Sequence, residues 1–159
     1  MRKLIAVGLT FCAALGACQI SSGEMSESDR AAIEEAIRAK LQEYVDVLAT
    51  LDPERMAPFY AEGMRYYPDE HAMDRDSLLT LIGGLGRDFR RYDVSNDVID
   101  ITPLSREAAL AAVRFHTLQT DTLGVDSRVV GTVTWVWALR AGDWRIIHGQ
   151  SIHLPDTGD

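Results

Sequence analysis

Two polar residues near the end of the chain, His148 and Gln150, are the best candidates for chemistry because they alternate with apolar residues. An imidazole can exchange a proton near neutral pH, and a carboxamide can hydrogen-bond a ligand without carrying charge. An unpaired polar group is costly to bury, so each side chain needs a protein partner, a water molecule or a ligand. For either residue alone, a satisfied position inside the core is the alternative to a binding role.

The last β-hairpin decides which way these side chains point. A two-residue turn at Ala141-Gly142 and a four-residue loop over residues 140–143 predict the same strand pairing. From the turn outward, the pairs are Leu139 with Trp144, Trp137 with Ile146, Trp135 with His148, and Val133 with Gln150. Side chains alternate along a strand, so these eight residues share one aromatic face that should meet the helices. We therefore expect His148 and Gln150 to border a pocket beside Trp135.

Tyrosines supply further candidate groups for such a pocket. An isomerase-type site pairs a carboxylate base with a neutral acid inside one apolar pocket. Phenols that could act as the acid are present at Tyr44, Tyr60, Tyr66 and Tyr67. No carboxylate is obvious on the pocket face, since Asp93, Asp97 and Asp100 are interpreted as solvated. The polar run 69–74 is interpreted as a solvated turn, so we predict no metal site and no cofactor.

The elements that position these residues follow from hydrophobic periodicity. Apolar spacings of three and four predict a helix over residues 29–51, capped by Ser26 or Ser28. Asp52-Pro53-Glu54 predicts a second helix that runs to about Ala61. The remaining predicted elements are a short edge strand at 64–67, a third helix at 75–90, and strands at 92–102, 108–120, 127–140 and 143–153. Helices followed by an antiparallel sheet indicate an α+β fold.

Length and composition bound the function. The 159 residues suffice for one domain, and 47% hydrophobic residues are enough to build a core. The formal charge of −8 argues against binding nucleic-acid phosphates, so no nucleic-acid partner is predicted.

The first 17 residues have the features of a secretory signal. Arg2 and Lys3 precede an apolar run that is too short to span a bilayer as a helix. The segment Leu15–Cys18 resembles the lipobox of bacterial lipoproteins, which implies cleavage before Cys18 and acylation of that residue. An ordinary secretory signal followed by an accidental cysteine is the alternative. Losing Arg2 and Lys3 with the signal would take the formal charge from −8 to about −10.

The predicted organisation is therefore a signal over residues 1–17, a lipidated Cys18 with a tether over 18–28, a domain over 29–154 and a tail over 155–159. We expect an exported protein that acyl chains anchor stably to the cell envelope. Gln19 follows the cysteine, which in the lipoprotein family favours the outer membrane, facing the periplasm in a Gram-negative cell.

The domain resembles the SnoaL-like members of the nuclear-transport-factor-2-like (NTF2-like) superfamily. Many members end in the pattern Gly-x-Trp-x-Ile-x-His-x-His-x-Ser, which Gly142, Trp144, Ile146 and His148 match. Gln150 and Ile152 depart from it, and Ser151 stands one position from the usual serine. The resemblance implies a cone-shaped, cystatin-like roll with three N-terminal helices against a curved, mostly antiparallel sheet. It also implies a pocket at the open end and a homodimer through the outer sheet face.

The sequence thus predicts a membrane-anchored domain that binds a small, largely apolar molecule in its cone. The expected ligand-binding residues are Tyr44, Tyr60, Tyr67, Trp135, His148 and Gln150. His148 would orient the ligand and Gln150 would support it. One alternative is an isomerase, cyclase or dehydratase that uses His148 as its catalytic acid/base. Another is a dimeric scaffold whose cone is filled by its own tryptophans.

Overall fold

The computed structural model describes residues 24–68 and 70–155. Cys18, the predicted signal and most of the predicted tether lie outside the described residues. Among the described residues, no helix has the length and apolarity needed to cross a bilayer.

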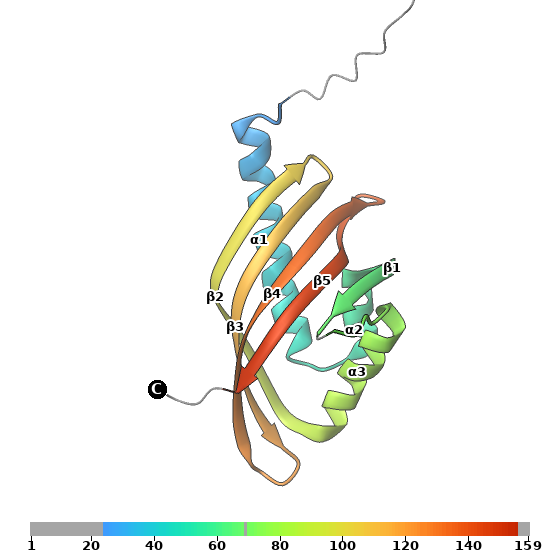
Figure 1. Ribbon diagram of the computed structural model, residues 1–159, viewed down its shortest axis with the longest axis vertical. Coiled ribbons are helices and arrows are strands. Elements are labelled where there is room, and N and C mark those ends of the chain that lie inside the picture. Colours follow the sequence, from blue (N-terminus) through green and yellow to red (C-terminus); the bar gives the residue numbers. More distant parts are fainter. Residues whose placement is uncertain (1–23, 69, 156–159) are drawn as a thin grey trace, which may run out of the picture.

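The chain runs helix, helix, strand, helix and then four long strands, as predicted, and the five strands form one sheet of an α+β fold (Figure 1). The sheet order is β1-β5-β4-β3-β2, with β1 parallel to β5 and every other pair antiparallel. The elements are α1 (Glu27–Leu48), α2 (Pro53–Met56), the 3-10 turn η1 (Ala57–Phe59), β1 (Tyr60–Tyr67), α3 (Arg75–Asp88), β2 (Phe89–Ser105), β3 (Ala108–Asp121), β4 (Asp126–Arg140) and β5 (Asp143–Pro155).

The long helix α1 forms where the apolar stripe predicts it, with a two-residue shift at its start. Ser26 is the N-cap, and its hydroxyl accepts a hydrogen bond from the Asp29 amide at 3.1 Å. The second helix is shorter than predicted. It ends at Met56, because the backbone from Tyr60 onward pairs with β5 instead of continuing a helix to Ala61.

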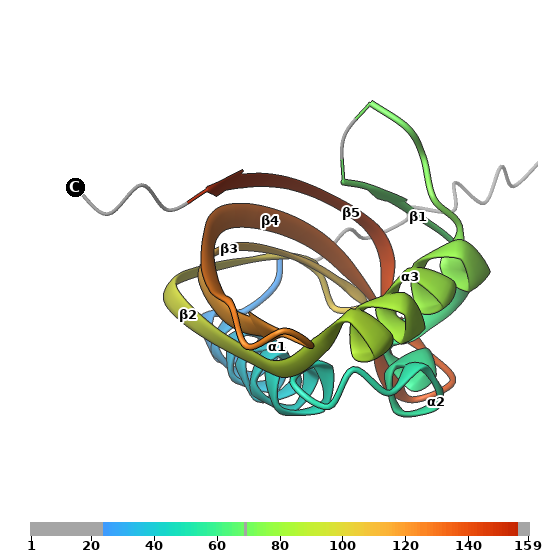
Figure 2. The ribbon, with the colours of Figure 1, turned by 90° about the horizontal axis from the view of Figure 1, so that it is seen from below.

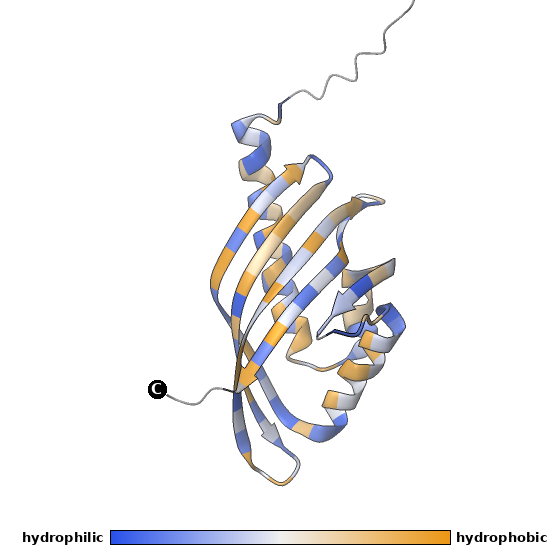
Figure 3. Ribbon diagram, in the orientation of Figure 1, coloured by the Kyte–Doolittle hydropathy of each residue, from blue (hydrophilic) through white to orange (hydrophobic). Residues whose placement is uncertain are grey.

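The sheet curves over α1 (Figure 2). The helices α2 and α3 lie to one side of α1 in the same view. Polar and apolar residues alternate along the strands, which gives the sheet one inner and one outer face (Figure 3). The inner face and the helices enclose the hydrophobic core. Its fully buried members include Ile37, Leu41, Met56, Tyr60, Met64, Trp137 and Ile146.

The β4–β5 hairpin departs from the predicted register in its outer half. The pairs Leu139–Trp144 and Trp137–Ile146 are confirmed, but Val136 then pairs with His148, which leaves Ile147 as an extra residue in a bulge. Beyond the bulge the partners are Trp135 with Gly149, Thr134 with Gln150, and Val133 with Ser151. The predicted pairs Trp135–His148 and Val133–Gln150 are therefore wrong.

The packing of Trp135 gives a physical reason for the shift. A Cβ atom on Gly149 would lie 2.1 Å from Cζ3 of the Trp135 ring, so only glycine leaves room for the indole. The bulge places Gly149 opposite Trp135 and moves the side chains on either side of this glycine from the inner to the outer face of the sheet. His148 and Gln150 are consequently exposed on the outer face.

Candidate ligand-binding site

A cavity of about 160 Å³ lies between the inner face of the sheet and helices α1 and α3. Most of its wall is apolar. The apolar side chains come from α1 (Leu41, Val45, Leu48), from α3 (Leu78, Leu81, Ile82, Leu85) and from the sheet (Val94, Val113, Phe115, Val133, Trp135). Leu81 and His153 line the cavity and are also exposed, so its mouth lies between α3 and the end of β5.

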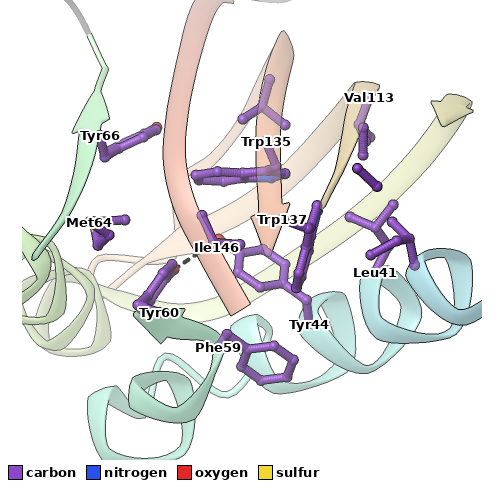
Figure 4. Close-up of a cluster of buried hydrophobic side chains, with 14 of the residues drawn as sticks. Leu41, Tyr44, Phe59, Tyr60, Met64, Tyr66, Val113, Trp135, Trp137 and Ile146 are labelled. Atoms are coloured by element: carbon purple, nitrogen blue, oxygen red, sulfur yellow. Dashed lines mark hydrogen bonds between the residues drawn. The ribbon is translucent and has the colours of Figure 1, made fainter. Parts of the chain in front are cut away.

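Aromatic rings form one wall around Trp135 (Figure 4). Tyr66 stacks on the indole with ring centroids 5.3 Å apart, and the Tyr44 ring lies 5.8 Å away at a tilt. Phe59 packs edge-on against Tyr44 at 5.5 Å. These contacts hold the phenol rings of Tyr44 and Tyr66 next to the Trp135 indole. The hydroxyl groups of the two tyrosines can orient a ligand there.

The first polar group of the cavity is a pair of phenols. The Tyr44 and Tyr60 hydroxyls are 3.0 Å apart, buried, and directed toward one another (Figure 4). Burial raises the pKa of Tyr44 well above its ordinary value and also raises the pKa of Tyr60. Both phenols are therefore protonated at neutral pH. One proton serves the bond between them, and the other is left to donate elsewhere.

The second polar group is a chain of three residues that runs to the mouth. The Tyr66 hydroxyl lies 2.5 Å from Ser151 Oγ, which lies 3.3 Å from Nδ1 of His153. Burial raises the pKa of Tyr66, and its hydrogen bond with Ser151 opposes that rise. Loss of solvation lowers the pKa of His153 from its ordinary 6.5. At neutral pH the chain consists of uncharged groups.

The cavity as a whole is uncharged. Tyr92, whose pKa is raised by burial and whose hydroxyl bonds to Thr117, completes the polar lining together with Asn96. Within the described part of the chain, no Asp, Glu, Lys or Arg side chain lines the cavity, and no three potential metal ligands cluster. Such a site can hold a neutral molecule and hydrogen-bond its oxygen atoms.

The structure brings three of the six predicted binding residues together. Tyr44, Tyr60 and Trp135 line the cavity, whereas Tyr67, His148 and Gln150 do not. The Tyr67 ring instead lies 5.5 Å from the His148 ring, and Tyr67 and Gln150 are paired residues of β1 and β5. His148, the residue considered for a catalytic role, does not line this cavity.

The sequence interpretation missed Tyr66, Tyr92, Asn96, Ser151 and His153 as lining residues. One feature of the sequence could have indicated Ser151 and His153. Ser151 stands one position from the serine of the terminal pattern, which is the offset that a one-residue bulge produces. With that shift, the inward series beyond the bulge becomes Gly149, Ser151 and His153.

Neither a protein-family model nor a curated protein sequence matches the chain. Solved structures do match. An NTF2-like superfamily protein from Salmonella enterica serovar Typhimurium is 18% identical with a TM-score of 0.71, over 80% of this chain and 95% of that one. The chain has the NTF2-like fold.

Two enzymes or candidate enzymes also share this NTF2-like fold. A candidate scytalone dehydratase from Novosphingobium aromaticivorans is 19% identical with a TM-score of 0.75, over 81% of this chain and 89% of that one. A hexachlorocyclohexane dehydrochlorinase from Novosphingobium barchaimii is 13% identical with a TM-score of 0.68, over 84% and 97%. At these identities the similarity concerns the fold, and the function has to be argued from the site.

Proposed function

We propose that the domain binds a small, uncharged, largely apolar molecule that carries a hydrogen-bond-accepting oxygen. The cavity volume of about 160 Å³ supports a ligand of this size. It is close to the ~150 Å³ of an engineered apolar cavity that takes up benzene. The apolar wall favours a ring or short hydrocarbon, and the absence of charged lining side chains among the described residues favours a neutral one.

The observation that carries the proposal is the spare proton of the Tyr44–Tyr60 pair. Neither hydroxyl has a second hydrogen-bond partner among the described residues. A buried donor without an acceptor costs about 1–3 kcal/mol, and the oxygen of a bound ligand would remove that cost. A carbonyl or ether oxygen at the inner end of the cavity is therefore the matching group.

Binding is favoured over the two alternatives. The enzyme alternative assigned the acid/base role to His148, and neither His148 nor any carboxylate of the described residues lines this cavity. A cone filled by its own tryptophans would leave no cavity, whereas Trp137 packs in the core and Trp135 forms one wall.

A matched pair of probes tests the proposal. Acetophenone has a carbonyl oxygen where isopropylbenzene has a methyl group, and the two molecules are otherwise of equal size. We expect the protein to bind acetophenone about 3- to 10-fold more tightly, since one hydrogen bond is worth about 0.5–1.5 kcal/mol. Titration calorimetry measures both affinities.

The double variant Tyr44→Phe/Tyr60→Phe should lose this preference, because it keeps both rings and removes both hydroxyls. Tyr67→Phe is the control, since Tyr67 lies outside the cavity. Equal preference in the double variant, or no binding of either probe, would contradict the proposal. Native mass spectra before and after lipid extraction then show whether a small molecule co-purifies.

We also propose that Cys18 anchors the domain to the cell envelope. The lipobox-like segment supports this, and α1 begins at Glu27, nine residues after the cysteine. Such a tether reaches at most about 30 Å. Metabolic labelling with a palmitate analogue should label the wild type and Cys12→Ala but not Cys18→Ala. Unchanged labelling of Cys18→Ala would contradict the anchor.

A further inference from the structure

The hydrogen-bonded chain from Tyr66 to His153 connects the interior of the cavity with its mouth. Tyr66 is 7% exposed and Ser151 is 4% exposed, so the first two members are closed to solvent. His153, the third member, is exposed on one side. A change of protonation at the outer end can therefore be transmitted inward through two hydroxyl groups.

The direction of the hydrogen bonds in the chain depends on whether Nδ1 of His153 carries a proton. Tyr66 and Ser151 each carry one hydroxyl proton, and each hydroxyl can donate once and accept as well. When Nδ1 of His153 carries no proton, it accepts from Ser151, and Ser151 accepts from Tyr66. The proton of Tyr66 is then used within the protein, and only its oxygen lone pairs face the ligand.

Protonation of Nδ1 reverses every bond in the chain. The imidazolium then donates to Ser151, and Ser151 donates to Tyr66. The Tyr66 hydroxyl is now free to donate its proton into the cavity. The same phenol is thus an acceptor toward the ligand in one state of His153 and a donor in the other.

The surroundings of His153 allow this titration. Phe115 of β3 packs against the His153 ring, with the two ring centroids 5.3 Å apart. On β4, the residue paired with His153 is Gly131, which has no side chain. The titratable groups that line the cavity with it are phenols: Tyr44, Tyr60, Tyr66 and Tyr92. Loss of solvation is the one cause that shifts the pKa of His153, and no charged side chain contributes. Burial disfavours the charged ring, so the imidazole is neutral at neutral pH, and we assign its single proton to Nε2, which leaves Nδ1 to accept from Ser151. The second proton, on Nδ1, is taken up with a pKa that burial lowers from the ordinary 6.5.

We propose that Ser151 and His153 are positioning residues that set the hydrogen-bond polarity of Tyr66 and thereby select the ligand. This inference rests on the proposed function. At neutral pH the cavity prefers a molecule with two polar groups, an accepting oxygen for the Tyr44–Tyr60 pair and a donating hydroxyl for Tyr66. A small hydroxylated ketone or hydroxylated ring ether is the matching class. In acid the preference for the donating hydroxyl is lost.

Phenol and anisole test the inference, because they differ by replacing a hydroxyl proton with a methyl group. Neither probe changes its charge between pH 7.5 and pH 4.5, since a phenol titrates near 10. The ratio of their dissociation constants therefore cancels general effects of acid on the fold. We expect the wild type to prefer phenol by about 3- to 10-fold at pH 7.5, the value of one hydrogen bond. As the pH is lowered toward 4.5 and His153 takes up its proton, the ratio should fall toward one.

Three variants separate positioning from a merely structural role. His153→Gln should give the same ratio at both pH values, because the titrating group is gone. Ser151→Ala should abolish the pH dependence by cutting the chain. His148→Gln is the matched control on the outer face of the same strand, and it should keep the wild-type ratio and its pH dependence. Circular dichroism confirms that each variant is folded.

Each outcome decides the inference. A ratio that is independent of pH in the wild type overturns it while leaving the proposed binding function intact. A pH-dependent ratio that persists in His153→Gln also overturns it, and this exposed position remains informative if Ser151→Ala fails to fold. If neither probe binds at either pH, the proposed function fails and this inference fails with it.

Discussion

The two halves of β5 differ in what determines which side chains face the cavity. Next to the turn, Trp144 and Ile146 face inward opposite Leu139 and Trp137, as simple alternation predicts. Beyond Ile147 the inward residues are Gly149, Ser151 and His153, and the two residues favoured by alternation, His148 and Gln150, face outward. Because of the one extra residue in β5, the polar residues of this strand that line the cavity are Ser151 and His153 instead of His148 and Gln150.

This comparison shows that the near half is fixed by local rules and the far half by packing. Turn length sets the first pairs, because a two-residue turn and a four-residue loop both bring Leu139 opposite Trp144. Further out, the Trp135 indole requires a residue without a side chain beneath it, and Gly149 is that residue. The one-residue bulge satisfies both requirements, because it keeps the pairs set by the turn and brings Gly149 opposite Trp135.

Insertion of an alanine after Ile147 should break this arrangement with the largest effect. With the one-residue bulge retained, the longer strand would place the His148 side chain opposite Trp135 and turn Ser151 away from Tyr66. We expect urea unfolding to show a loss of about 3 kcal/mol or more, from overpacking and a broken buried hydrogen bond together. Ile147→Ala keeps the strand length and should cost only about 1 kcal/mol. An insertion no worse than Ile147→Ala would contradict the role given to the register beyond the bulge.

Gly149→Ala tests the packing argument alone. The added Cβ would lie 2.1 and 2.2 Å from two carbons of the Trp135 ring, so the indole must move. We expect the free energy of unfolding to fall by about 1–3 kcal/mol and the probes of the cavity to bind more weakly. Gly84→Ala in α3 is the control, because the new atom would meet only an Arg87 guanidinium nitrogen at 3.7 Å. Its effect should stay within about 1 kcal/mol.

Much of the fold was predictable because periodicity is a local property of the chain. The stripe that predicted α1 contains Ile33, Ile37, Leu41 and Tyr44, and all four are buried. The stripe also placed Tyr44 correctly on the cavity side. The anchor at Cys18 and the homodimer stay predictions.

Half of the site was not predictable because it depends on contacts between distant segments. Tyr66 and Tyr67 are neighbours on β1, so their side chains point to opposite faces. Which one enters the cavity is set by the pairing of β1 with β5, where the register shifts between Tyr60 and Arg65. Local sequence gives no preference between two adjacent tyrosines, and the structure places Tyr66 inside.

Ser151 and Gln150 are adjacent residues of β5 whose side chains lie on opposite faces of the sheet, Ser151 buried and Gln150 exposed. Ser151→Ala leaves the buried Tyr66 hydroxyl without its partner at 2.5 Å, so unfolding should become easier by about 1–2 kcal/mol. Gln150→Ala changes an exposed residue next to it and should alter stability by less than about 0.5 kcal/mol. Equal effects in urea unfolding would mean that the two residues are not on different faces.

The smallest expected effect is a pH dependence that belongs to His153. Its pKa is lowered in the folded state from the ordinary 6.5, so the folded protein prefers the neutral ring. Above pH 6.5 both states hold a neutral imidazole and the residue contributes nothing. As the pH falls through 6.5, the unfolded chain takes up the proton first, which draws the equilibrium toward unfolding. The penalty stops growing once the pH lies below the folded-state pKa.

Wild type should therefore lose more stability than His153→Gln between pH 7.5 and pH 5, by a small amount because the ring is exposed on one side. Urea unfolding at several pH values measures the difference between the two curves. Parallel curves would mean that the environment at the end of β5 does not distinguish the neutral ring from the charged one. The folded chain would then not desolvate His153, and the contrast between the two faces of β5 would be one of packing alone.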